Sequence, residues 1–354
     1  MAPAARPALP ESPVGAPVRA EAMLDHLILH IGTHETGTSS IQEFLAARRD
    51  ALAARSICYP VAGRADAGIG SMSHHGLALA ATDDGSEGPL AALADEVLAE
   101  CGRDGCGTLL LSSEDLTAVM RPGVLAERLP ARRTTIVVGL RPQHDAMTAM
   151  YTTALAFRQV PIAPKAYYET ELVPYFDYYE LLSRWRGAFP RARVLVRPFD
   201  RGRPARRDAV RDFLEALEIP LSPPVGRQET ASNPTLPARG TVAMRALLEL
   251  GLSREQFRVV FRLLHELGGE LGEVMSVYSP DERRLAHEQF RATNRRVRRD
   301  FLDGHDADLF DEPVVEDEAG WQAEFGRPGQ VERRVFVDFV RWLLARSEGP
   351  AGPG

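Results

Sequence analysis

The stretch Leu27-Ile-Leu-His-Ile-Gly-Thr-His-Glu-Thr-Gly-Thr-Ser-Ser40 decides the fold class of this chain. Its first five residues form a short apolar run typical of a buried strand, and an amphipathic helical pattern begins at Ile41. Between them, Gly32 to Ser40 is rich in glycine and hydroxyl side chains. A loop of this kind, followed by the unpaired N–H groups and positive end of a helix, favours phosphate binding. An ordinary strand–turn–helix with Ser/Thr capping is the other interpretation.

The composition is that of a globular cytoplasmic protein. The 354 residues are 44% hydrophobic, and the net charge of -7 provides no basic field to hold a nucleic acid. Cys58, Cys101 and Cys106 are an odd count without metal-ligand spacing, which indicates a reducing cytoplasm and no metal site. Residues 1–22 and 347–354 are expected to be disordered tails. No stretch approaches the roughly 20 apolar residues of a membrane span, so we expect no membrane partner.

Strand patterns alternate with helical patterns through the first two thirds of the chain. Alternation of this kind predicts an α/β, P-loop-like three-layer fold, with a central parallel sheet flanked by helices. We expect one domain over 23–346, with 241–346 mostly helical. Gln159 to Leu172 interrupts the helical pattern and is expected to form a lid. The predicted strands are 27–31, 108–111, 134–140 and 193–196, and the predicted helices are 41–54, 90–98, 145–157, 175–188, 242–250, 254–267, 280–302 and 331–345.

The loop resembles that of a known enzyme family. Sulfotransferases that use 3′-phosphoadenosine 5′-phosphosulfate (PAPS) carry H-K-T-G-T-[ST]-[ST] after their first strand, and 34–40 matches every position but one. The spacing is also similar to the nucleotide-binding P-loop, but Thr38 stands at the position of the P-loop lysine, which argues against an ATPase or kinase. Further segments are similar, in order and spacing, to landmarks of bacterial members: 112–114, 136–141, Tyr151, 178–185, 197–199, 210–214 and 290–295.

The resemblance implies a donor site for PAPS as co-substrate, without a metal. The residues that would hold the 5′-phosphosulfate are Thr36, Gly37, Thr38, Ser39 and Ser40. Arg141, at the end of its predicted strand, would pair with the 3′-phosphate through a bidentate fork. The family usually has a serine eight residues later, where this chain has Ala149. Thr148 is a weak substitute, because one residue on a helix rotates a side chain by about 100°.

The resemblance also implies an acceptor site beside the strand 108–111. Glu114 follows that strand and would take the proton of the acceptor, a hydroxyl or amine of a small molecule or carbohydrate. Asp115 is the adjacent alternative, and a plain helix cap at Ser112 or Ser113 would explain the same pattern. His74 and His75 lie where the family draws acceptor-site residues, and a polar helix cap is the equal alternative.

Glu35 is the departure from the family pattern. A lysine normally stands there, and a carboxylate would repel the phosphosulfate by on the order of several kcal/mol at an effective dielectric near 20. We include Glu35 and its neighbour His34 with the catalytic residues, and expect Lys165 or Arg158 to close over the donor as the salt-bridge partner of Glu35. Use of a different anionic donor and loss of catalysis are the competing explanations of the substitution. The sequence predicts a PAPS-dependent sulfotransferase, with an inactive nucleotide-binding protein as the alternative.

Overall fold

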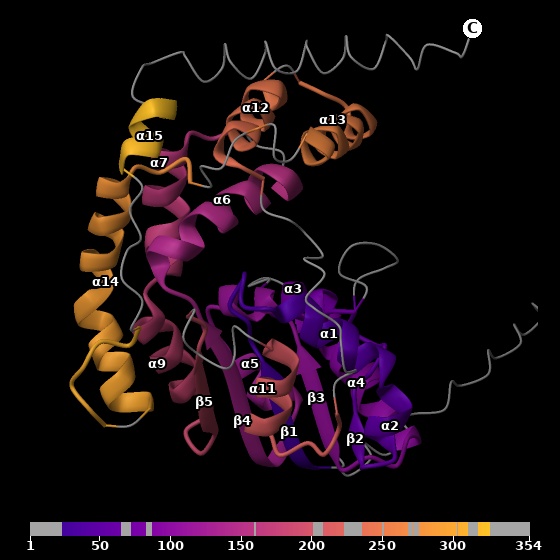
Figure 1. Cartoon of the computed structure of the whole chain (residues 1–354). Helices are drawn as coiled ribbons and strands as arrows, with labels where there is room; N and C mark the ends of the chain where they lie inside the picture. The colour runs from indigo at the N-terminus through magenta and orange to yellow at the C-terminus, as the bar shows by residue number, and fades with distance from the viewer. Residues whose placement is uncertain are drawn as a thin grey trace, which may run out of the picture.

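In the computed structural model of the chain, the residues that the structure describes include five parallel strands, which form one sheet in the order β2-β3-β1-β4-β5 (Figure 1). Their bounds are β1 Leu24–His30, β2 Ile57–Cys58, β3 Thr108–Ser112, β4 Ala131–Leu140 and β5 Arg193–Pro198. The prediction of a central parallel sheet flanked by helices is confirmed. The strand β2 was not predicted, because two residues are too few to show a periodic pattern.

The structure describes residues 23–64, 72–82, 87–158, 161–200, 208–222, 236–249, 251–267, 271, 276–302, 304–310 and 318–325. The two predicted tails and the predicted helix 331–345 lie outside the described residues.

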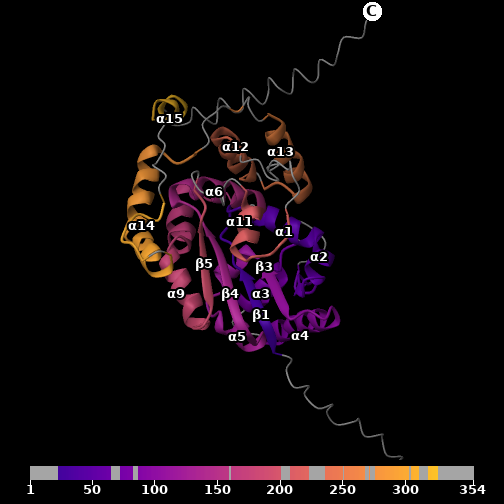
Figure 2. The ribbon, with the colours of Figure 1, turned by 60° about the horizontal axis from the view of Figure 1, so that its bottom comes forward.

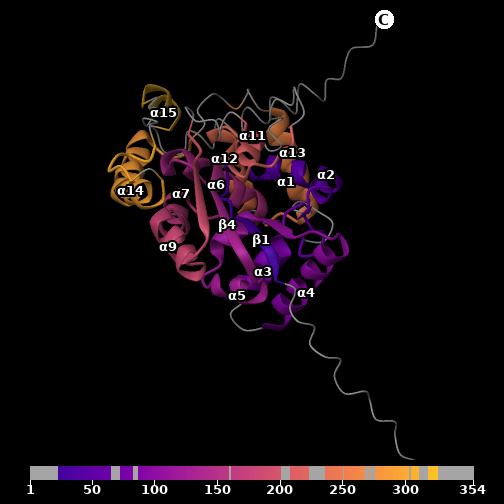
Figure 3. The ribbon, with the colours of Figure 1, turned by 90° about the horizontal axis from the view of Figure 1, so that it is seen from below.

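Two apolar cores cover the two faces of the sheet, because alternate strand residues point to opposite sides. Ile28 and Val137 face the helices α1 (Thr38–Ala47), α2 (Arg49–Ala53) and α11 (Ala209–Ala216). Leu29 and Ile136 face the other side, which is covered by α3 (His75–Thr82), α4 (Glu87–Arg103) and α5 (Gly123–Arg128). The two helical layers lie on either side of the strands when the molecule is seen from below (Figure 3). This is the predicted three-layer arrangement.

A helical part adjoins the sheet at the edge formed by β5 and beyond the strand ends. The helix α14 (Pro280–Phe301) packs against α6 (Gln143–Arg158) and α9 (Tyr178–Ala188), and α12 (Ala238–Leu248) packs against α13 (Arg254–Leu267) and α6. In Figure 2, α12 and α13 lie along the top of the molecule, and α14, α9 and α15 (Glu318–Phe325) lie along its left side. The prediction of a helical C-terminal part is therefore confirmed. Among the described residues, no helix is both long and apolar enough to cross a membrane.

The stretch predicted as an interruption is largely helical. From Pro164 the chain runs through α7 (Pro164–Tyr167), the π-helical turn η2 (Tyr168–Leu172) and α8 (Val173–Tyr175). Proline at the first helical position is compatible with a helix because its missing N–H has no partner there in any case. Tyr167 is buried against the Tyr151 ring, with 5.6 Å between ring centroids. The apolar spacing did not predict this helix, because its sequence contains prolines and its buried residues include tyrosines.

Candidate functional site

The loop between β1 and α1 ends on an open helix N-terminus. Gly37 has a left-handed backbone (φ 76°), and the first helical hydrogen bond of α1 runs from Ile41 N to Gly37 O at 3.2 Å. The N–H groups of 38–40 precede that bond, and no side chain in the described part of the chain caps the helix. Ser39 is exposed and Ser40 half-buried. This end of α1 can therefore receive an anion.

The first half of the loop is bound to β4. Thr33 donates its N–H to Gly139 O at 2.9 Å and its hydroxyl to the same carbonyl at 3.0 Å. Thr36, which is buried, donates its hydroxyl to Thr33 O at 2.6 Å. A Cβ on Gly139 would lie 2.8 Å from Thr36 Oγ1, so only glycine fits there. The hydroxyl of Thr36, expected to face the donor, instead holds the loop in shape.

Glu35 points towards α6. Its backbone is left-handed (φ 63°), a conformation that is costly for a residue with a side chain. One carboxylate oxygen, Oε1, accepts a hydrogen bond from Thr153 Oγ1 at 2.9 Å, and the other, Oε2, lies 4.0 Å from Arg141 Nη1. Among the described residues, Arg141 is the cation that faces this carboxylate, and the expected contact between Lys165 and Glu35 is not formed in this structure, where Lys165 lies beside Glu169.

Arg141 is held between two carboxylates. Its Nε donates to Asp145 Oδ2 at 2.7 Å, and its Nη1 donates to the backbone oxygen of Glu35 at 3.2 Å. Only 14% of its side chain is exposed. Burial opposes the charged form, but the charges of Asp145 and Glu35 outweigh it and raise the pKa of the guanidinium above its ordinary value. Tyr178 OH fixes the backbone by donating to Arg141 O at 2.8 Å.

Lys165 serves a different part of the surface. Its side chain is 77% exposed and lies 3.9 Å from Glu169 Oε1. It lines a groove of about 760 Å³ between α6, η2 and α14, together with Met147 and Tyr278. No residue of the β1–α1 loop lines that groove. Arg158 is the last residue of α6, and its side chain lies outside the described part of the chain.

Thr148 faces away from the loop. Its hydroxyl lies 2.7 Å from Ser276 Oγ, in the contact between α6 and the segment before α14. Thr153 is the α6 hydroxyl that reaches the loop, and sequence reasoning missed it. The available signal was spacing: Thr153 stands four residues after Ala149 and so on the same helix face.

The backbone and ring of His34 contact Tyr175. His34 N donates to Tyr175 OH at 2.9 Å, and the two ring centroids are 5.8 Å apart. The His34 side chain is half-buried. This contact ties the loop to α8, which directly follows the stretch 159–172 that is predicted as a lid.

Glu114 lies directly beside the loop. A Cβ on Gly32 would come within 2.9 Å of Glu114 Cα, which shows how closely the end of β3 approaches the loop. Gln42, which is buried in α1, donates its amide Nε2 to Glu114 Oε2 at 2.8 Å. The candidate base and the helix of the anion loop are therefore joined by one side chain.

Ser113 caps the 3-10 turn η1 (Glu114–Ala118) by accepting a hydrogen bond from Asp115 N at 3.2 Å. The cap that the sequence offers as the alternative explanation of this pattern is therefore present as well.

The two neighbouring histidines have different environments. His74 is fully buried, with Nε2 3.1 Å from Pro60 O and Nδ1 3.1 Å from Ser112 N. Burial, reinforced by the charge of Arg64, lowers its pKa to about 3. The neutral ring therefore donates from Nε2 and accepts at Nδ1. His74 is a structural residue that docks the start of α3 on the end of β3.

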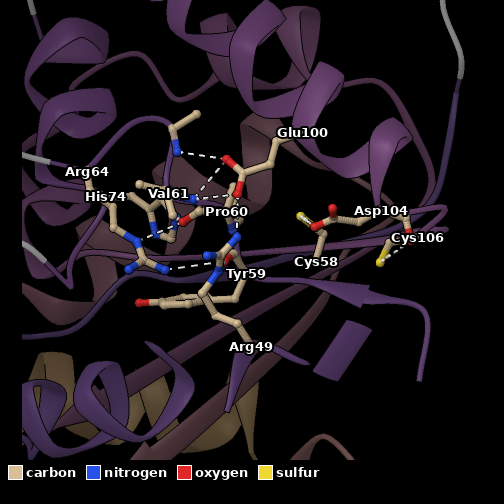
Figure 4. A network of polar contacts seen from close by, with 11 residues as sticks. Arg49, Cys58, Tyr59, Pro60, Val61, Arg64, His74, Glu100, Asp104 and Cys106 are labelled. Atoms are coloured by element: carbon tan, nitrogen blue, oxygen red, sulfur yellow. Dashed lines mark hydrogen bonds and ion pairs between the residues drawn. The ribbon is translucent and has the colours of Figure 1, made fainter. Parts of the chain in front are cut away.

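The segment after β2 holds His74 in place. Glu100 accepts hydrogen bonds from Val61 N and Ala62 N, each at 2.9 Å, and from Arg49 Nη2 at 2.6 Å (Figure 4). Figure 4 also shows His74 beside Pro60 in this network. Because Glu100 is buried, three donors are needed to stabilise its charge.

His75 turns outward from the same position. Its Nδ1 lies 2.5 Å from Asp115 Oδ2, and the two side chains are 36% and 31% exposed. A carboxylate bound to one ring nitrogen orients the imidazole and leaves the other nitrogen, Nε2, available to a substrate. His75, Asp115 and Glu114 thus gather at the carboxyl end of β3, where ligands of parallel sheets collect.

Among the described residues, no group of three or more His, Cys, Asp or Glu side chains is arranged to hold a metal ion.

Comparison with known proteins adds one distant similarity. Over 146 residues the chain is 33% identical to an uncharacterized protein of Archaeoglobus fulgidus, a match that covers 41% of this chain and 40% of the archaeal protein. No protein-family model matches the chain, and no solved structure does.

Proposed function

We propose that this protein transfers a sulfonate group from a nucleotide 5′-phosphosulfate to a hydroxyl or amine of a small molecule or carbohydrate. The donor that the sequence resemblance implies is PAPS. One observation carries the proposal: an open helix N-terminus for an anion and a carboxylate suited to proton removal stand side by side, joined by the 2.8 Å hydrogen bond between Gln42 and Glu114.

The loop and α1 support the binding of a phosphosulfate. The N–H groups at the start of α1 and the dipole of the helix attract negative charge, and the first turn of the helix contains no acidic side chain. Gly37 supplies the left-handed backbone (φ 76°) that turns the chain into the helix. A leaving phosphate would gain stabilisation from the same donors as its charge builds up.

Glu114 supports the transfer step. The acceptor oxygen or nitrogen would attack sulfur in line, the bond between sulfur and the bridging oxygen would break, and the acceptor proton would pass to Glu114. Gln42 engages Oε2, which leaves the other oxygen of the carboxylate for that proton. His75, oriented by Asp115, is suited to bind the acceptor beside it.

A binding protein without turnover is the second candidate, and Glu35 favours it. The carboxylate stands where the resembled family has a cation, and its nearest cation, Arg141, is shared with Asp145. In that case the loop would hold a nucleotide without activating it.

One experiment separates the two candidates. The purified full chain is incubated with PAPS and a panel of phenols, amines and sugars, and release of adenosine 3′,5′-bisphosphate is followed while calorimetry measures nucleotide binding. Release that depends on an acceptor supports transfer, and binding without release supports the binding protein. The same assay is run with adenosine 5′-phosphosulfate as the donor. The absence of binding and of release with both donors would contradict the proposal. We also propose a cytoplasmic location, which fits the three buried cysteines being free thiols.

A further inference from the structure

The residues expected to grip a 3′-phosphate are already engaged in this chain. Arg141 donates to Asp145 at 2.7 Å and to the Glu35 backbone at 3.2 Å, and the Glu35 carboxylate lies 4.0 Å away. One positive and two negative side chains therefore meet at this point, which leaves a local charge of about -1. A phosphate monoester would bring up to two further negative charges to a place that is already negative.

The hydroxyl groups on α6 provide no replacement. The position eight residues after Arg141 is Ala149, which has no hydroxyl, and the hydroxyl of Thr148 pairs with Ser276 at 2.7 Å. Thr153, the hydroxyl that does reach the loop, donates its proton to Glu35 Oε1 at 2.9 Å. Among the described residues of α6, the hydroxyl facing the loop thus stabilises a carboxylate instead of a phosphate.

The Glu35 carboxylate has the chemistry of a hydroxyl receptor. Thr153 fixes Oε1, and Oε2 is directed towards Arg141 at a distance too long for a hydrogen bond, so it can accept a proton donor from a ligand. Nucleotide-binding proteins make this distinction elsewhere: a carboxylate accepts from a free ribose hydroxyl, whereas an arginine accommodates a phosphate on that hydroxyl. Here both groups are present, but the carboxylates neutralise the arginine.

We infer that the donor site selects a nucleotide 5′-phosphate or 5′-phosphosulfate whose ribose 3′-hydroxyl is free, with Glu35 as the specificity-determining residue. The inference rests on the proposed function, because it assumes that the loop holds the 5′-phosphate. It departs from the donor that the sequence resemblance implies. A ribose hydroxyl would donate to Glu35 Oε2, and a 3′-phosphate would be repelled by Glu35 and Asp145.

The test is calorimetric binding of two probes that differ only at the 3′ position, adenosine 5′-phosphate and adenosine 3′,5′-bisphosphate, to the full chain. The wild-type protein is expected to bind the monophosphate more tightly, by on the order of tenfold or more. Glu35→Gln keeps the size of the side chain and removes its charge, and it should reduce or reverse this preference by about tenfold. The ratio of two affinities is insensitive to a general loss of folded protein.

Glu127→Gln is the matched control, because it removes one exposed carboxylate of α5 and should leave the ratio unchanged. Turnover with adenosine 5′-phosphosulfate against PAPS gives a second, independent arm. Equal or tighter binding of the bisphosphate by the wild-type chain overturns the inference and leaves the proposed function standing. Binding of neither probe overturns both, and a preference unchanged in Glu35→Gln removes Glu35 as its cause.

Discussion

Two neighbouring regions at the carboxyl edge of the sheet use their charges in different ways. Beyond β1 and β4, Glu35, Arg141 and Asp145 pair with one another, and Thr153 completes the group. Beyond β3, Glu114 and His75 each have one protein partner and one side left open. In the first region the charged side chains already bind one another without a ligand. In the second region one carboxylate oxygen of Glu114 and one ring nitrogen of His75 remain available to a ligand.

This difference separates a positioning role from a chemical one. A self-paired cluster cannot easily accept another charge, since every added charge must compete with those already present. A carboxylate and an imidazole held at one end only can exchange protons with a ligand. We therefore expect substitutions beyond β3 to change turnover or acceptor binding, and substitutions beyond β1 and β4 to change which nucleotide binds.

The largest effect is expected for Glu114→Gln. The amide keeps the shape of the side chain and can still accept from Gln42, but it cannot take a proton, so turnover should fall by about 10²- to 10⁴-fold. Nucleotide affinity should stay within about twofold, because the anion loop is untouched. Steady-state rates together with calorimetry measure both quantities. Full activity in Glu114→Gln would transfer the role of base to another group and end the proposed division between the regions.

The buried histidines beneath the region predict a loss of stability in mild acid. Burial lowers the pKa of His30 to about 4, and burial with Arg64 lowers that of His74 to about 3. Because both values lie below the unfolded value of 6.5, the unfolded state binds the extra protons: stability is complete above pH 6.5 and falls as the pH drops from there towards 4 and 3. At pH 5 each histidine should cost about 2 kcal/mol.

Urea unfolding followed by tryptophan fluorescence at pH 7.5 and pH 5 measures this loss. Glu and Asp side chains ordinarily titrate below pH 5, so the histidines account for most of the change in stability between pH 7.5 and pH 5. His74→Gln should remove part of the pH dependence, because the amide can replace both hydrogen bonds without titrating. The rest would come from His30 and from the half-buried His26, whose pKa is also lowered to about 4 by burial and by the charge of Arg133. Equal stability at the two pH values would contradict the structural role of these rings and with it the contrast between His74 and His75.

The sequence allowed the sheet and most helices to be predicted, because both rest on local patterns. Leu27 to Ile31 and Thr134 to Leu140 are apolar runs that only a strand explains well, and α13 was predicted with its observed bounds. The helix beginning at Pro164 was missed because its buried contacts come from tyrosines, which give no clear apolar period. The helical structure of this segment depends on its tertiary contacts, such as that of Tyr167 with Tyr151.

The sequence indicated which residues lie at the site, but it did not indicate which of their side chains contact one another. The loop and Glu114 follow strand ends, which a sequence reveals, and they do lie together. The contact of Glu35 with Thr153 joins residues 118 positions apart, and no local pattern encodes it. Thr36 and Thr148 were expected to face a ligand, but each hydroxyl has a partner within the protein.

A smaller effect is expected where the anion loop meets α11. At Gly37 (φ 76°) a Cβ would lie 2.5 Å from Ala209 Cβ, so Gly37→Ala combines backbone strain with overlap. Gly105 (φ 64°) has no atom within 4 Å of such a Cβ, so Gly105→Ala adds strain alone and serves as the control. We expect Gly105→Ala to cost about 1 kcal/mol and Gly37→Ala a further 1–3 kcal/mol or so. Urea unfolding of both variants measures the difference, and equal costs would mean that α11 does not fix the loop.

The smallest effect tests whether His75 contacts the acceptor. His75→Gln removes a ring that Asp115 holds at 2.5 Å, and the KM for the acceptor should rise about tenfold, the value of one hydrogen bond to a ligand, with little change in kcat. Asp115→Asn should produce a similar rise, since it releases the ring from its orientation. A stable variant with unchanged KM would show that the pair only ties α3 to η1. The region beyond β3 would then contain a single functional group, Glu114, and the contrast with the paired cluster beyond β1 and β4 would depend on that residue alone.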